Sequence, residues 1–158
     1  MAVLHAEPLG WHSSGVRILS AGEEITRLAI SAFRGKGSFD LGGETFIIEP
    51  EGFFRSNAVL KKGSSVIARV QKPSLLRRRF EISSAGHRLV LESRGWTGRE
   101  YGLLLGSSEV GLIKREGFGG RKLTLEFPDD VPMVLQVFLA YVVAAQAKRE
   151  RAAAAAGS

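Results

Sequence analysis

The chain has 158 residues, 44% of them hydrophobic and 24% charged, which is typical of one globular domain and excludes a disordered or collagen-like protein. It contains no cysteine, so disulfides, thiolate metal sites and cysteine nucleophiles are excluded. The formal net charge is +6, and the first residues do not resemble a secretory leader, so a cytoplasmic protein is expected.

Almost everything before residue 128 follows the pattern of short β-strands. Apolar and polar residues alternate, and pairs such as Gly42 and Gly43 interrupt the runs where tight hairpin turns need a positive φ. In chain order the predicted strands cover residues 16–19, 25–33, 38–41, 44–49, 53–60, 65–71, 78–82, 87–92, 99–105, 109–114 and 121–127. About eleven or twelve strands at this spacing predict an antiparallel sandwich or barrel. Gly102 and Gly111 fall inside strands, where glycine indicates a bulge or close packing.

The chain changes character after residue 127. An aspartate at 129 or 130 can cap a helix and Pro132 suits its first turn, so a helix is predicted from about residue 131 to between 148 and 151. Its apolar side chains cover all sides of the helix, as in a helix that is buried or spans a membrane. The single domain is expected to cover residues 1–151, and residues 152–158 are expected to form a disordered tail.

Two environments can hold this apolar helix. A tail anchor is one alternative, since basic residues follow the helix. However, the apolar run over 131–147 is short for a bilayer and includes Gln136 and Gln146. A helix that fills the interior of a closed sheet is therefore favoured, and no transmembrane span is expected.

Five segments resemble those of a known family. They are VIARVQKP at 66–73, RFEI at 79–82, GREY at 98–101, VGLI at 110–113 and DDVP at 129–132. With many short strands followed by one hydrophobic helix, they resemble the tubby-like superfamily, in the branch of LURP-one-related proteins and phospholipid scramblases, over roughly residues 15–150. The resemblance implies a closed antiparallel barrel of about twelve strands around a C-terminal hydrophobic helix. Scramblases have a cysteine cluster and a calcium-binding acidic segment that this chain lacks, so calcium-dependent scrambling is not implied.

Basic charge is concentrated in the middle of the chain. Residues 1–51 carry 4 basic and 7 acidic residues, residues 52–99 carry 11 and 2, and residues 100–158 carry 7 and 7. The candidate binding residues lie within this middle third: Lys61, Lys62, Arg69, Lys72, Arg77, Arg78 and Arg79. Such local basicity predicts an anionic partner.

Anionic phospholipid is the favoured ligand for these bases. Arginine binds phosphate bidentately, and Leu75 and Leu76 between the bases can dip into a membrane surface. In tubby proteins, lysines and arginines on the barrel surface bind phosphoinositides, and the resemblance implies this chemistry without a residue-by-residue match. The sequence thus predicts a non-enzymatic cytoplasmic binding module that can lie peripherally at the membrane. A solvated arginine-rich loop without a ligand is the alternative.

Two other functions stay open. One is a ligand-free scaffold or a stress-related interaction protein. The other is a nucleic-acid-binding protein, because phosphate contacts look alike in sequence and Phe53, Phe54 and Phe80 lie near the bases.

Catalysis and metal binding have little support in the sequence. His5, His12 and His87 lack the spacing of metal ligands, and no paired carboxylates stand out, so no catalytic residue, metal or cofactor is predicted. Trp11 and His12 are expected to plug or pair with the barrel edge, and Trp96 to fold over the barrel mouth rather than to anchor a membrane or partner.

Overall fold

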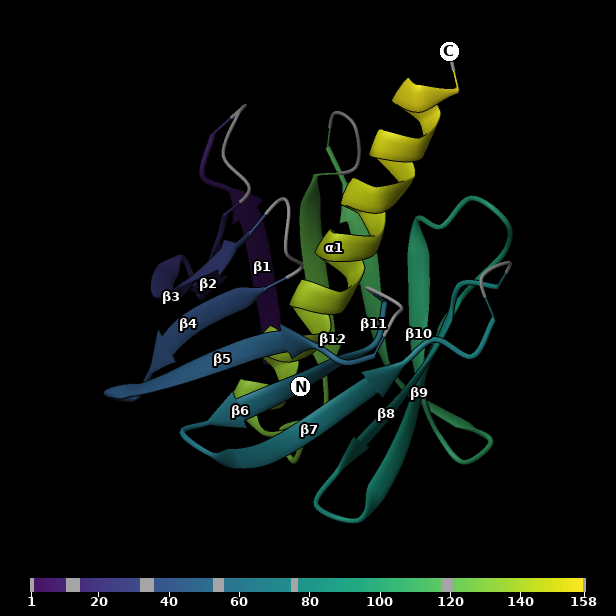
Figure 1. The fold of residues 1–158 in the computed structure, drawn as a ribbon. Helices are drawn as coiled ribbons and strands as arrows, with labels where there is room; N and C mark the ends of the chain where they lie inside the picture. Colours follow the sequence, from purple (N-terminus) through teal and green to yellow (C-terminus); the bar gives the residue numbers. More distant parts are fainter. Residues whose placement is uncertain are drawn as a thin grey trace.

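Twelve antiparallel strands close into a barrel around one helix in the computed structural model, which describes residues 2–10, 15–31, 36–52, 56–74, 77–117 and 121–157 (Figure 1). The strands are β1 (Ala2–Pro8), β2 (Val16–Ser20), β3 (Glu23–Ile30), β4 (Gly37–Leu41), β5 (Glu44–Pro50), β6 (Ala58–Lys62), β7 (Ser65–Gln71), β8 (Arg79–Ser84), β9 (His87–Ser93), β10 (Glu100–Leu105), β11 (Ser108–Glu116) and β12 (Lys122–Phe127). Each strand pairs with its neighbours in the chain. The predicted fold class is confirmed.

The strand that closes the barrel is the one that the sequence patterns miss. β1 pairs with β12 from Ala2 opposite Phe127 to Ala6 opposite Leu123, and it pairs with β2 on its other side. The predicted set of strands, which begins at residue 16, therefore lacks the first strand of the barrel. A short run ending in proline is a weak strand signal until both of its partners are known.

Two other predicted strand boundaries move by three residues or more. β3 ends at Ile30 rather than at residue 33, and β6 begins at Ala58 rather than at residue 53. Strand bounds depend on the pairing partner as well as on the local pattern, so errors of this size are expected at strand ends.

The two ends of the barrel are built differently. At one end, which we call the turn end, two-residue turns join the strands of five hairpins, at 21–22, 42–43, 63–64, 85–86 and 106–107. Gly42 and Gly43 have φ values of 60° and 79°, as predicted for a tight hairpin. At the opposite end, which we call the loop end, the connections are longer and span 9–15, 31–36, 51–57, 72–78, 94–99 and 117–121.

Helix α1 (Met133–Ala156) begins at the turn end, runs through the barrel and projects from the loop end (Figure 1). Val137, Phe138, Leu139 and Val143 are completely buried against the inner faces of the strands. The prediction of a helix inside a closed sheet is confirmed. Within the described residues, no helix combines the length and the apolarity needed to cross a membrane.

Both ends of α1 differ from the prediction. Pro132 occupies the N-cap position and no side chain caps the helix, so the predicted aspartate cap is wrong. Leu135 and Gln136 instead donate their backbone N–H groups to the carbonyl of Pro132. At the other end, residues 152–156 continue as exposed helix rather than as a disordered tail, which fits the high helix propensity of alanine.

Glycines allow the helix and the wall to approach closely. At Gly111 an added Cβ would overlap the ring of Phe127, which confirms the close packing predicted there. At Gly37 an added Cβ would lie 3.2 Å from Cε2 of Tyr141 on α1. The contact at Gly37 brings the helix against the wall near the loop end, where β4 begins, whereas the contact at Gly111 packs β11 against β12.

Candidate anion-binding site at the loop end of the barrel

The seven predicted binding residues do not form one patch. Lys61 and Lys62 end β6 beside the turn at 63–64, so they lie at the turn end. Lys72, Arg77 and Arg78 belong to the connection between β7 and β8 at the loop end. Arg69 and Arg79 lie on strands and point outwards, since their sequence neighbours Val70 and Phe80 face the core.

Four of the seven bases are paired with glutamates of the barrel wall, three of them on an adjacent strand and one, Glu51, in the connection after β5. The pairs are Lys61 with Glu49 at 3.1 Å, Lys62 with Glu44 at 2.6 Å, Arg69 with Glu51 at 3.2 Å and Arg79 with Glu92 at 3.1 Å. Three of these glutamates come from the acidic first third of the chain. Much of the charge that is segregated along the sequence is therefore neutralised by ion pairs within the barrel wall.

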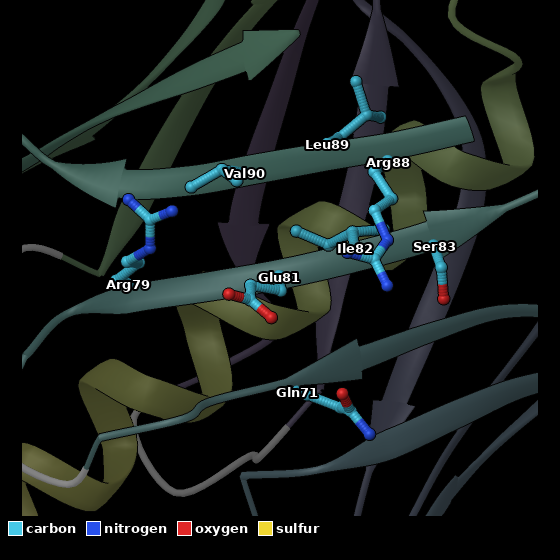
Figure 2. Close-up of a pocket in the computed structure, with 8 residues that line it drawn as sticks. All are labelled: Gln71, Arg79, Glu81, Ile82, Ser83, Arg88, Leu89 and Val90. Atoms are coloured by element: carbon cyan, nitrogen blue, oxygen red, sulfur yellow. The ribbon is translucent and has the colours of Figure 1, made fainter. Parts of the chain in front are cut away.

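A shallow groove on the outer face of β7, β8 and β9 includes one of these four bases, Arg79 (Figure 2). It is lined by Gln71, Arg79, Glu81, Ile82, Ser83, Arg88, Leu89 and Val90. Figure 2 shows the carboxylate of Glu81 between the guanidinium groups of Arg79 and Arg88. Because Arg79 is also bound to Glu92, the groove carries charges of both signs and does not concentrate cations.

At the loop end, the inner side of the barrel wall changes from apolar to basic. Strand residues alternate between the two faces, so a residue two positions from a core-facing one shares its face. Basic residues stand two positions beyond core residues at several strand ends, among them Lys72 after Val70, Arg78 before Phe80, Arg115 after Ile113 and Arg121 before Leu123. Where α1 leaves the barrel it adds Arg149 and Glu150.

Arg78 and Arg115 share one carboxylate, that of Glu150. Arg78 donates from Nε to Oε1 of Glu150, and Nη1 of Arg115 lies 3.6 Å from Oε2. The side chain of Arg115 is only 11% exposed. The two guanidinium groups thus approach the carboxylate from the connection before β8 and from β11, and each oxygen has its own cation.

The connection at 94–99 fixes both arginines from the outside. Arg78 donates from Nη1 to the carbonyl of Trp96 at 2.7 Å, and Arg115 donates from Nη1 to the carbonyl of Gly98 at 3.0 Å. Gly98 has a φ of +69°, and an added Cβ would lie 2.7 Å from Nε of Arg78. A glycine is therefore needed here both for the backbone conformation and for the approach of Arg78.

Electrostatics identify the groups that gather around this carboxylate. Burial lowers the pKa of Lys72, and Arg149 and Arg78 lower it further while Glu150 raises it. Burial raises the pKa of Tyr101 to about 12, with Glu150 adding to the rise and Arg78, Arg115 and Arg149 opposing it. Among the described charges that act on these two groups, Glu150 is the one acid. We call Lys72, Arg78, Arg115, Arg149 and Glu150 the loop-end cluster.

Trp96 lies beside the loop-end cluster, with its side chain in solvent. It is 86% exposed, so the prediction that it folds over the barrel mouth is wrong. Its backbone is held by Arg78 while its indole ring is free of the core. The alternative role as a membrane or partner anchor is compatible with this exposure.

The residues considered for other functions are placed as follows. Phe80 is fully buried and cannot stack on a nucleic-acid base. His87 is exposed beside the turn at 85–86, and His5 contacts Thr124 at 3.4 Å. Among the residues that the structure describes, no three His, Asp or Glu side chains gather as a metal site. Trp11, His12, Phe53, Phe54, Leu75 and Leu76 lie outside the described residues.

Sequence reasoning missed three members of the cluster: Arg115, Arg149 and Glu150. Arg115 carries a usable signal, because it follows buried Ile113 by two positions and so faces inwards in a barrel. Arg149 and Glu150 carry no such signal in the sequence. Their position depends on how far α1 extends through the barrel before it reaches the loop end.

Comparison with known proteins finds no match, whether among family models, curated proteins or solved structures. Membership of the tubby-like superfamily stays a prediction that rests on the five sequence segments and on the barrel with its internal helix.

Proposed function

We propose that the protein is a non-enzymatic binding module that recognises the anionic headgroups of a phospholipid membrane at the loop end of its barrel. The observation that carries the proposal is the gathering of Lys72, Arg78, Arg115 and Arg149 around one carboxylate. A phosphate group can take up donors from several cations at once, and arginine offers them in a fixed fork.

A membrane is the source of phosphate that fits best, because an exposed tryptophan stands beside these cations. Trp96 presents a large amphipathic ring to solvent, and such rings partition to the headgroup region of a bilayer. The resemblance to tubby-like proteins supports the same class of ligand.

Vesicle co-sedimentation tests this function. The protein should bind vesicles that contain phosphatidylserine or a phosphoinositide, bind less as salt is added, and not bind phosphatidylcholine alone. Replacing Lys72 and Arg149 with glutamine should weaken binding about tenfold to thirtyfold, since each base near an anionic surface contributes about 1 kcal/mol.

The matched control removes two charges from the other end of the molecule. Replacing Lys61 and Lys62 with glutamine changes the net charge equally, but these lysines are paired with Glu49 and Glu44 at the turn end. Binding by this variant should stay within about threefold of the original protein. Equal losses in both variants, or a single-stranded oligonucleotide that binds the loop end more tightly than vesicles do, would overturn the proposal.

A further inference from the structure

Glu150 holds the place in the loop-end cluster that an anionic ligand needs. Its two carboxylate oxygens face different arginines, Oε1 facing Arg78 and Oε2 facing Arg115. This is how a phosphate group would bridge the same two guanidinium groups. The side chain of Glu150 is 25% exposed, so an incoming anion can reach it from solvent.

The two arginines have anchors that do not depend on Glu150. The carbonyls of Trp96 and Gly98 hold Arg78 and Arg115 at 2.7 Å and 3.0 Å. Removing the Glu150 carboxylate therefore leaves both guanidinium groups oriented toward the same point. A site whose donors stay in place binds a new anion without first ordering them.

The last turns of α1 extend beyond the barrel into solvent. Ala147 is the last buried residue of the described helix, and residues 151–157 are exposed. The ion pairs of Glu150 link these turns to the barrel wall. An exposed helix end is prone to local opening when such a link is lost.

We propose that Glu150 is an internal competitor for the anion site, and that a bound phosphate displaces its carboxylate and releases the final turns of α1. The inference rests on the proposed function and adds a means of regulation to it. Two anionic groups cannot share the pair of arginines at close range, because their repulsion offsets the gain from either one. Ligand binding and the state of the helix end are then coupled.

The test uses pyrophosphate as a soluble probe, with affinity measured by calorimetry. Glu150→Gln removes the competing charge and should bind pyrophosphate about fivefold more tightly than the original protein. Glu49→Gln is the matched control, because it removes the same charge from the pair with Lys61 on β5 and β6, outside the loop-end cluster. Its affinity should change by less than about twofold. Equal or weaker binding by Glu150→Gln would overturn the inference.

Hydrogen exchange in the unmodified protein gives a second test that needs no variant. Pyrophosphate should speed the exchange of backbone amides over 150–156, and slower or unchanged exchange would contradict displacement. The vesicle experiment separates the two proposals. If neither the original protein nor Glu150→Gln binds pyrophosphate or anionic vesicles, the proposed function fails. If the original protein binds both but Glu150→Gln gains nothing, only the displacement of Glu150 fails.

Discussion

The two ends of the barrel use basic residues in opposite ways. At the turn end Lys61 and Lys62 each have a glutamate of their own on β5, whereas at the loop end Arg78 and Arg115 share Glu150. Both ends take bases from one basic stretch of sequence, because β7 runs from Lys61 and Lys62 at the turn end to Arg78 at the loop end, where Arg115 is added from β11. The contrast teaches that a charged segment in a strand-rich protein is best judged by its neighbours in the sheet.

The contrast depends on a sealed apolar interior between the two ends, and Val137→Lys tests this most severely. Val137 is completely buried, so an unpaired ammonium group there should lower the free energy of unfolding by more than about 4 kcal/mol or prevent folding. Ala154→Lys, on the exposed last turn of α1, should change it by less than about 0.5 kcal/mol. Chemical denaturation measures both, and a soluble, cooperatively folding Val137→Lys protein would mean that the helix is not enclosed.

The unequal environments of the bases should appear as unequal stability effects. Arg115→Met keeps most of the side-chain volume but removes the bond to the Gly98 carbonyl and one partner of Glu150, so a loss of about 2 kcal/mol is expected. Lys61→Met breaks one exposed pair and should cost less than about 0.5 kcal/mol. Urea midpoints at neutral pH compare the two, and similar losses would erase the distinction between the ends.

Alkaline pH should lower the free energy of unfolding through the buried phenol of Tyr101 near the loop end. Burial raises the pKa of Tyr101 from 10.0 to about 12, so between these values the unfolded chain loses the phenolic proton while the folded protein keeps it. The unfolded state then binds fewer protons, and the free energy of unfolding falls as pH rises, by about 1.4 kcal/mol at pH 11. Denaturation series from pH 8 to pH 11 should show this decline, and Tyr101→Phe should decline less by that amount. If the two proteins lost stability equally with rising pH, the phenol of Tyr101 would titrate alike in the folded and unfolded states, which would contradict its burial.

The smallest expected difference in stability is between two variants that carry the same substitution, glycine to alanine, at opposite ends of the barrel. Gly43 and Gly98 both have positive φ, at 79° and 69°, so alanine at either should cost about 1 kcal/mol in backbone strain. At Gly98 the added methyl group also displaces Arg78, whereas nothing lies within 4 Å of a Cβ at Gly43. Gly98→Ala should therefore be the less stable of the two and should also bind anionic vesicles more weakly. Gly43→Ala should bind as the original protein does.

Much of the architecture was predictable because its signals are local. Alternation defines a strand within a few residues, Gly42 and Gly43 define a turn, and the apolar surface of α1 defines a buried helix. β1 was not predicted because it is recognised by its pairing with β12, which lies more than a hundred residues away in the chain. Non-local pairing leaves no mark on a short segment read by itself.

The candidate site was predicted only in part, for the same reason. Lys72 and Arg78 were identified because the sequence around them is rich in basic residues. The sequence around Lys61 and Arg69 is equally basic, yet these two residues pair with Glu49 and Glu51. Strand register decides which cations are neutralised by a glutamate on a neighbouring strand. The direction of each strand decides at which end of the barrel its basic residues lie. Neither property follows from charge density along the chain.

The passage of α1 through the barrel has a consequence for biosynthesis. All twelve strands precede the helix in the chain, so a ribosome releases the entire wall before the residues that fill its interior. Until Val137, Phe138 and Leu139 emerge, the inner faces of the strands have nothing apolar to pack against. The barrel must then finish folding after its last strand is made, as a single event in which wall and helix assemble together. Nascent chains arrested before residue 133 should remain protease-sensitive throughout, while chains carrying α1 clear of the exit tunnel should acquire protection in one step.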